Sequence, residues 1–178
     1  MASMESSIFI RTLRPHFVKG AQSVFMWRFF QQLRAHRQGQ DFIRWIGKLQ
    51  VQKKRTLDAW MDLLEPVLYD DSGFQADWTT YQQAQLAQNQ PPMDIEVALE
   101  RYNRRREENH KAAFPLSDNL YALTFIVLAD LSEPQRERLT STLTLRGYTV
   151  QMYTFEVVRE VFLELFCMPK SSLENPSL

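Results

Sequence analysis

The fold is decided by residues 116–166, which read LSDNLYALTFIVLADLSEPQRERLTSTLTLRGYTVQMYTFEVVREVFLELF. Apolar runs of helical length alternate here with residues that begin or end helices. Ser117 precedes the first run, Ser132 precedes the second with a proline and a glutamine in capping positions, and Thr154 precedes the third. Gly147 ends the second run. The stretch predicts three consecutive helices and indicates an assembly or interaction module more than an enzyme.

Two helices are predicted nearer the N-terminus. The first covers residues 21–37 with a crowded aromatic face, and a glycine follows it as a breaker. Asp41 is expected to cap the second, over residues 42–65, because apolar residues recur there at steps of three and four. The other side of this helix carries five basic residues, which are Arg44, Lys48, Lys53, Lys54 and Arg55. We therefore expect an amphipathic helix with a basic outer side.

The middle of the chain supplies a candidate domain boundary. Residues 77–89 are expected to form a short polar helix, and two prolines interrupt the chain after it. Asp94 is then expected to cap a helix over residues 95–111. With no repeat or strand pair visible, the sequence predicts an all-α helical bundle. Its expected parts are a flexible N-terminal arm (1–20), an N-terminal helical lobe (21–90), a C-terminal helical lobe (91–170) and a tail (171–178).

Charge is unevenly distributed although the formal net charge is zero. Residues 1–60 hold eleven Lys and Arg against three Asp and Glu, and residues 61–178 hold ten against eighteen. Such asymmetry is typical of a nucleic-acid or acidic-membrane face at the basic end, and it also suits head-to-tail contacts between copies. The alternative is a solvated helix surface whose charges pair within the chain.

The cysteine content and the lack of long apolar segments indicate the cellular compartment. Cys167 is the single cysteine, which excludes an internal disulfide framework and fits a reducing environment. No signal peptide is visible, and the longest near-apolar run, residues 120–129, is too short to span a bilayer. We expect a cytoplasmic protein without a transmembrane segment.

Catalytic and metal-binding patterns are weak. Asp71-Ser72-Gly73 matches the short triplet of aspartic proteases, but the apolar strands that support that site are missing, so we expect a β-turn. The histidines, at 16, 36 and 110, are far apart and share no ligand spacing with the cysteine. We therefore expect no catalytic, cofactor-binding or metal-binding residues and no small-molecule substrate.

The basic residues suggest nucleic-acid contact, although a basic helix face is more often only solvated. The basic side formed by Arg44, Lys48, Lys53, Lys54 and Arg55 is the candidate RNA-binding surface, because Lys and Arg neutralise phosphates. Trp45 and Trp60 lie on the apolar stripe and are expected in the core more than as platforms for bases. A second basic run, residues 104–106, is followed directly by two glutamates that partly neutralise it.

Several of these segments resemble a known family. LSEPQRERL at residues 131–139, LTLRG at 143–147 and the closing helix at 154–166 resemble the end of the Gag-like capsid region of copia-type retroelement polyproteins. DFIRWI at residues 41–46 and DAWMDLL at 58–64 resemble the earlier helices of such regions. The similarity covers about residues 24–170, and its motifs are helix patterns rather than invariant residues.

The resemblance implies a two-lobed α-helical protein that self-associates into shells around RNA. It implies core positions for Trp45, Trp60, Leu64, Leu123, Leu139, Val158 and Phe162, and an RNA-facing surface at Lys48, Lys53, Lys54 and Arg55. Family members often carry a Cys-rich zinc knuckle after this region, and the sequence here has none.

Other readings stay open. A helical adaptor or accessory subunit would dock onto a larger protein assembly through the aromatic face of residues 24–33. A third reading places the basic, aromatic N-terminal part on an anionic membrane surface, and an enzyme comes last. Self-assembly without a partner distinguishes the capsid reading from the adaptor reading.

Overall fold

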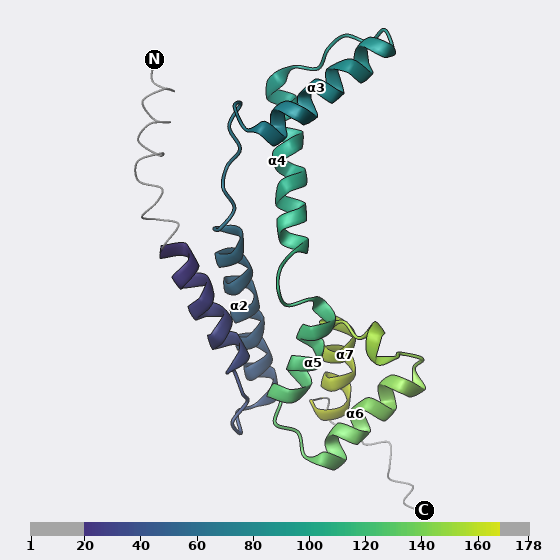
Figure 1. Cartoon of the computed structure of the whole chain (residues 1–178). Coiled ribbons are helices and arrows are strands. Elements are labelled where there is room, and N and C mark those ends of the chain that lie inside the picture. Colours follow the sequence, from purple (N-terminus) through teal and green to yellow (C-terminus); the bar gives the residue numbers. More distant parts are fainter. Residues whose placement is uncertain (1–19, 168–178) are drawn as a thin grey trace, which may run out of the picture. The chain divides into compact units, whose positions relative to one another are not determined.

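The computed structural model describes residues 20–167, and every regular element in that part of the chain is helical, which confirms the predicted all-α class. Figure 1 shows the order of the elements. A helical segment over residues 20–33 is followed by α2 (Phe42–Met61), α3 (Ser72–Ala87), α4 (Ile95–Ala112), α5 (Asp118–Leu128), α6 (Glu133–Leu145), the 3-10 turn η1 (Val150–Met152) and α7 (Phe155–Phe166). The expected tail and, apart from Gly20, the expected arm lie outside the described residues.

The chain folds into two compact units. The first contains described residues 20–25 and 57–114, and the second contains residues 26–56 and 115–167. The helical segment over residues 20–33 and the longer helix α2 therefore each contribute to both units.

This division differs from the expected boundary between residues 90 and 91. The helices α3 and α4 flank that position, yet both belong to the first unit. Their contact is made by Phe74, which is buried, and by Tyr102, whose ring meets it edge-on at 5.7 Å between centroids. The two prolines lie in a break between helices, as predicted. A break in the sequence does not determine whether the flanking helices pack against each other, and in this structure the segment connects two helices that do.

Aromatic residues fill the core of the first unit near the end of α2. Phe25 is buried, and its ring lies 5.1 Å from Trp60 and 6.5 Å from Phe114. Trp60 also stacks on His110 at 4.6 Å with nearly parallel planes. The indole N–H of Trp60 donates to the backbone carbonyl of His110 at 2.7 Å, and His110 Nε2 donates to the backbone carbonyl of Trp60 at 2.8 Å. Because a carbonyl can only accept, Nε2 is the protonated ring nitrogen of His110. The pair joins α2 to α4.

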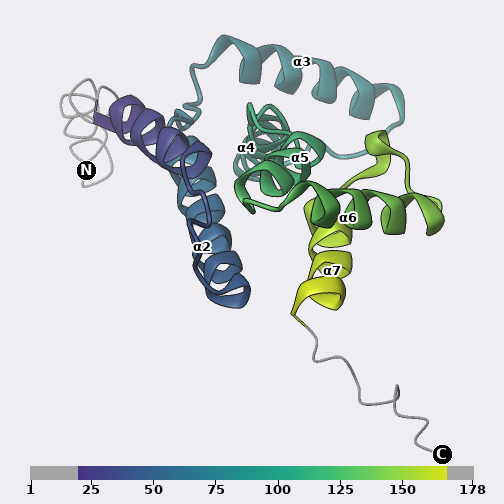
Figure 2. The ribbon, with the colours of Figure 1, turned by 90° about the horizontal axis from the view of Figure 1, so that it is seen from below.

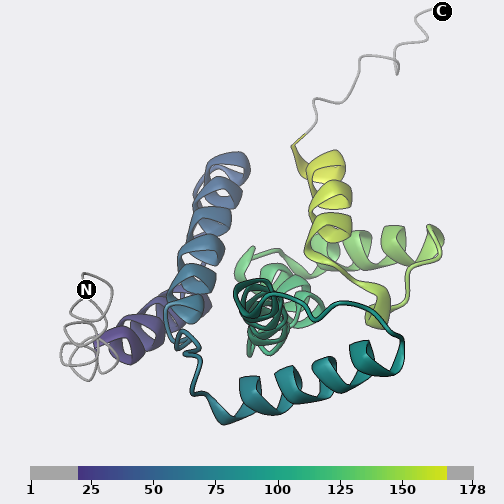
Figure 3. The same ribbon diagram turned by 90° about the horizontal axis from the view of Figure 1, so that it is seen from above.

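The core of the second unit lies between α2, α5 and α7. Trp45 stacks on Phe125 at 5.1 Å, and Phe125 in turn meets Phe162 at 5.2 Å. The indole N–H of Trp45 donates to the carbonyl of Ala35 at 2.8 Å, so its polar atom is satisfied although the residue is 2% exposed. Figures 2 and 3 show α6 running across α7, where Leu139 closes the core with no exposed surface.

Most of the expected core positions are buried. Trp45, Leu139, Val158 and Phe162 have at most 2% of their surface exposed, which confirms the prediction for these four residues. Trp60, Leu64 and Leu123 are half-buried.

The predicted ends of the last three helices are confirmed. The hydroxyls of Ser117 and Thr154 accept amide hydrogen bonds from α5 and α7, and Gln135 Oε1 accepts from the amide of Ser132 at 3.0 Å at the start of α6. After α6, Gly147 adopts φ +83°, and its amide and the next one bond back to carbonyls of the last turn. This is the Schellman arrangement, in which a left-handed residue favours glycine.

The earlier helices begin at aspartates. Asp41 and Asp94 cap α2 and α4, as predicted, by accepting amide hydrogen bonds at 3.0 and 2.8 Å. Asp71 caps α3 in the same way at 3.0 Å, so the triplet expected as a β-turn instead begins a helix. This helix starts at residue 72 rather than 77 because the cap supplies the acceptor that its first amides need. The helices expected to end at residues 37 and 65 end at 33 and 61.

The loop after the helical segment 20–33 is fixed to the C-terminus of α5. Arg37 donates from its amide to Leu128 O at 2.9 Å and from its side chain to Ala129 O at 3.0 Å, which satisfies carbonyls that the helix end leaves free. Asp130 accepts from the amide of Gln38 at 2.8 Å and contacts His36 at 3.0 Å. These hydrogen bonds hold the pKa of the Asp130 carboxyl below its usual range.

Cys167 caps the end of α7. Its amide donates to Leu163 O at 2.8 Å, and its side chain is half-buried. Burial, and to a lesser degree the carboxylate of Asp41, raise the pKa of this thiol.

Substituting Asp130→Asn is expected to lower the free energy of unfolding at pH 7 and to flatten its pH dependence. Because the folded-state pKa is the lower one, the ionised carboxylate stabilises the fold above its unfolded pKa of about 3.9 and stops doing so as the pH falls through the folded value. Wild type and variant should therefore converge below about pH 4. Asn tolerates the φ of +50° at this position, so the substitution tests the charge.

Urea unfolding at several pH values measures this difference. Glu137→Gln is the control, because that carboxylate is exposed in the same unit. A gap between wild type and Asp130→Asn that keeps its size at pH 2 to 3, about the end of carboxylate titration, would contradict the role of Asp130.

Removing the buried indole of the second unit should be far more costly than removing an exposed one. Trp45→Ala deletes the stack on Phe125 and is expected to destabilise the protein by about 3–5 kcal/mol. Trp27→Ala is the matched control, since Trp27 is 64% exposed in the same unit, and it should cost less than about 1 kcal/mol. Urea unfolding followed by circular dichroism compares them, and equal losses would contradict the described core.

Candidate nucleic-acid interface

The two sides of α2 have opposite characters in the second unit. One side is buried through Trp45, Leu49 and Thr56, each with 2% or less of its surface exposed. Four of the five predicted RNA-binding residues, which are Arg44, Lys48, Lys54 and Arg55, are exposed on the remaining surface of the helix. The amphipathic helix that the sequence predicts is therefore present, with a basic outer side.

Three of these residues form a stripe. Arg44, Lys48 and Arg55 are separated by four and seven residues, which places them within about 40° of one another around the axis and along about 16 Å of helix. We call these three residues the basic stripe. Lys54 is exposed beside it. The apolar side chains of Ile43 and Val51 accompany it, at 62% and 50% exposed.

Little in the described residues neutralises the basic stripe. Lys48 donates to the side-chain oxygen of Gln40 at 2.7 Å, a neutral partner that leaves its charge uncompensated. Within residues 20–167, neither arginine of the stripe nor Lys54 has a carboxylate at ion-pair distance. These cations can therefore meet a phosphate without first breaking an ion pair.

Lys53 does not share this surface. Its ammonium group lies 2.9 Å from Asp118 Oδ1, and it also lies over the rings of Tyr121 and Phe155 at 4.4 and 5.2 Å. Position 53 follows Arg44 by nine residues, which is close to half a turn around the helix, so it faces the opposite side. The structure thus separates Lys53 from the other four predicted residues and commits it to contacts within the second unit.

The tyrosine beside Lys53 stays neutral. Burial, followed by the carboxylates of Asp118 and Glu156, raises the pKa of Tyr121 well above its usual range. Its hydroxyl lies 3.4 Å from the carbonyl of Leu49, to which a protonated oxygen can donate. This side chain is therefore a structural donor in the core.

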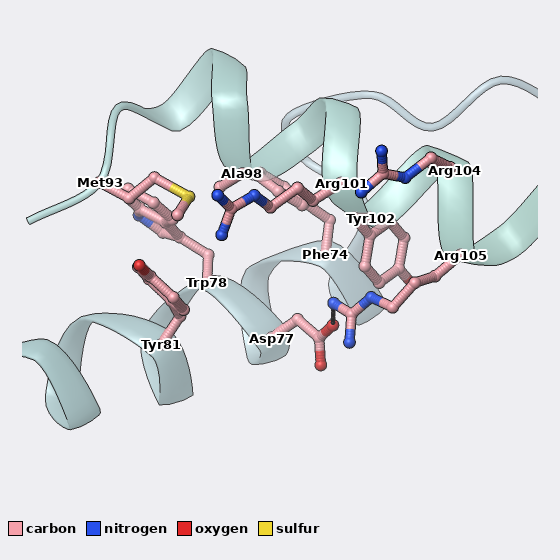
Figure 4. A pocket seen from close by; sticks show the side chains of 10 residues that line it. All are labelled: Phe74, Asp77, Trp78, Tyr81, Met93, Ala98, Arg101, Tyr102, Arg104 and Arg105. Atoms are coloured by element: carbon pink, nitrogen blue, oxygen red, sulfur yellow. Dashed lines mark hydrogen bonds and ion pairs between the residues drawn. The ribbon is translucent and has the colours of Figure 1, made fainter.

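A pocket lies in the first unit between α3 and α4 (Figure 4). Its volume is about 270 Å³. Its apolar lining comes from Phe74, Trp78, Tyr81, Met93, Ala98 and Tyr102, and its polar lining from Asp77, Arg101, Arg104 and Arg105. The pocket therefore combines four aromatic rings with three guanidinium groups.

Sequence reasoning missed this pocket. Phe74, Trp78 and Tyr81 recur at steps of four and three, a spacing that places their rings on one side of a helix. The sequence contains this spacing, but nothing local in it shows that α4 packs against these rings. Gly73 permits the close approach, since a methyl group there would lie 2.5 Å from the Tyr102 hydroxyl.

The arginine run at the end of the pocket is divided among different partners. Arg105 pairs with Asp77 of α3 at 2.5 Å, and Arg106 donates to the carbonyl of Glu65 at 3.1 Å. Arg101 and Arg104 are exposed and have no carboxylate at ion-pair distance within the described part of the chain. The glutamates after the run, expected to neutralise it in part, form no such ion pair with it among these residues.

The described residues contain no group of three His, Cys, Asp or Glu side chains placed to hold a metal ion. None of the helices between residues 20 and 167 combines the length and apolar character needed to cross a bilayer.

Comparisons with protein-family models, with curated proteins and with solved structures give no match for this chain.

Proposed function

We propose that the chain is a Gag-like structural protein that assembles with copies of itself and associates with RNA through the basic stripe of α2. The observation that carries the RNA part is the stripe itself: three exposed cations on one rigid helix, without carboxylate partners in the described residues. The resemblance of the helix pattern to copia-type capsid regions supports the assembly part.

The physics of phosphate binding favours this use of α2. Each phosphate that a Lys or Arg neutralises releases condensed counterions, and this gain requires cations that are not already paired. A helix buried along its other side holds the three cations in a fixed line of about 16 Å. Arginine adds two parallel hydrogen bonds to a phosphate, and the stripe offers two arginines.

Charge within the second unit supports association between copies. The outer ridge of α7 carries Glu156, Glu160 and Glu164 at one-turn intervals, all exposed. Glu156 and Glu164 pair with Arg159 and Arg146, whereas Glu160 has no cation at ion-pair distance among the described residues. Glu160 on α7 of another copy is therefore the carboxylate of this ridge that is open to the basic stripe, and such complementary charges steer association and set register. The exposed apolar side chains of Trp27 and Phe30, at 64% and 49%, supply area that an interface could bury.

Removing the basic stripe should weaken RNA binding in a salt-dependent way. The variant Arg44→Gln, Lys48→Gln, Arg55→Gln is expected to lose at least about tenfold in affinity for a single-stranded RNA oligomer, and the slope of log K against log salt should fall by about 2. Fluorescence anisotropy over a salt series measures both quantities. All three side chains are exposed, so the helical circular dichroism spectrum should stay unchanged.

Lys53→Gln is the matched control, because it removes one cation from the same helix on its other side. It should leave RNA affinity and salt slope unchanged while lowering stability slightly through the loss of the Asp118 contact. If the triple variant binds RNA as wild type does, or if Lys53→Gln lowers the salt slope by as much per charge, the proposed interface is wrong.

The second candidate function is a helical adaptor, which the exposed aromatic pair Trp27 and Phe30 favours. Light scattering on a sizing column distinguishes the two functions. The capsid proposal predicts growth from small species to large particles with concentration, promoted by RNA and reversed by salt. A monomer at every concentration that ignores RNA would contradict it and support a protein partner.

A further inference from the structure

We infer that the pocket between α3 and α4 binds a nucleoside phosphate, with the base against the aromatic side chains and the phosphate at Arg101 and Arg104. This inference goes beyond the proposed function. The pocket belongs to the first unit and shares no residue with the basic stripe, so either can be wrong without the other.

The apolar lining of the pocket suits a nucleobase. Phe74 is 1% exposed and forms a fixed floor, while Trp78, Tyr81 and Tyr102 are half-buried and keep part of their surface open. Aromatic rings stack on nucleobases, and such contacts contribute about 1–3 kcal/mol per base. A volume of about 270 Å³ is small for a ligand site. It therefore suits one planar ring system whose sugar and phosphate stay at the mouth.

Two arginines that have no carboxylate partner among the described residues suit a phosphate. Arg101 and Arg104 are three residues apart on α4, which brings them to the same side of the helix. In Figure 4 the guanidinium of Arg101 extends over the pocket toward the Trp78 end, that of Arg104 lies at the Tyr102 end, and that of Arg105 reaches Asp77. The ion pair neutralises the one carboxylate of the lining. The remaining two guanidinium groups give the mouth a positive charge and can each bond a phosphate.

The same lining disfavours other ligands. A cation over the aromatic rings would be repelled by the arginines, although aromatic cages otherwise suit cations. An uncharged apolar ligand would leave both arginines unused. The chemistry that uses both parts of the lining is a planar aromatic ring joined to an anion. A free nucleotide and one nucleotide of an RNA strand both present it.

The test uses the full chain with three probes: AMP, ribose 5-phosphate and a twelve-residue oligoadenylate, about the length that one single-strand-binding fold covers. Equilibrium dialysis measures AMP binding, and the part of the tryptophan fluorescence quenching that is lost in Trp78→Phe reports stacking on Trp78, because the chain has three other tryptophans. AMP should bind wild type at least about tenfold more tightly than ribose 5-phosphate, because only AMP can stack. Equal binding of the two would overturn the base contact.

Two variants test the arginines and the rings separately. Arg101→Gln, Arg104→Gln should weaken AMP binding at least about tenfold, whereas the matched control Lys111→Gln, Arg138→Gln removes two exposed cations elsewhere and should leave it unchanged. Gly73→Ala keeps every charge but places a methyl group 2.5 Å from the Tyr102 hydroxyl, so it should displace this ring and weaken AMP binding. If AMP binds the arginine variant as it binds wild type, the inference is wrong.

The oligomer identifies the source of the ligand. Displacement of AMP by the oligomer, lost in the arginine variant, identifies a nucleotide of a strand. AMP binding that the oligomer does not displace identifies a free nucleotide. Failure of both AMP and the oligomer to bind at this pocket overturns the inference. The stripe variant Arg44→Gln, Lys48→Gln, Arg55→Gln should bind AMP normally, which keeps this test separate from that of the proposed function.

Discussion

The burial of Trp45 against Phe125 determines the surface chemistry of the second unit. Once that indole lies in the core, the helical period leaves no freedom for the other positions of α2. Leu49 and Thr56 follow it inward, and Arg44, Lys48 and Arg55 are held at the surface in one line. The position of the basic stripe is therefore a consequence of core packing. A helix without such a large buried anchor could rotate and present another side.

Neighbouring carboxylates divide the cations of the described residues into two groups. Lys53 and Arg105 have opposite charges within reach, Asp118 and Asp77, and are used within their own units. The basic stripe and the pair Arg101 and Arg104 have none in the described residues, and these are the cations to which we assign ligands. A formal net charge of zero hides this difference, because it sums over cations that are already satisfied and cations that are not.

Local patterns predicted the elements better than their arrangement. Capping residues act within one turn of the chain, so Asp41, Asp94, Ser117 and Thr154 could be recognised without knowing the fold. The helical period alone also places Lys53 opposite Arg44, because nine residues end close to half a turn away. The pocket could not be found in this way, because its two walls belong to α3 and α4, and their contact depends on tertiary packing.

The reactivity of the thiol at the end of α7 depends on whether this helix is packed against its neighbours. Cys167 is the single cysteine of the chain, and its raised pKa keeps it in the protonated form that electrophiles attack slowly. Any motion that withdraws α7 from its neighbours would restore the ordinary acidity of the thiol and with it the ordinary reactivity. The rate at which Cys167 is alkylated, followed by mass spectrometry, therefore measures how often the second unit opens locally, without any substitution in the chain.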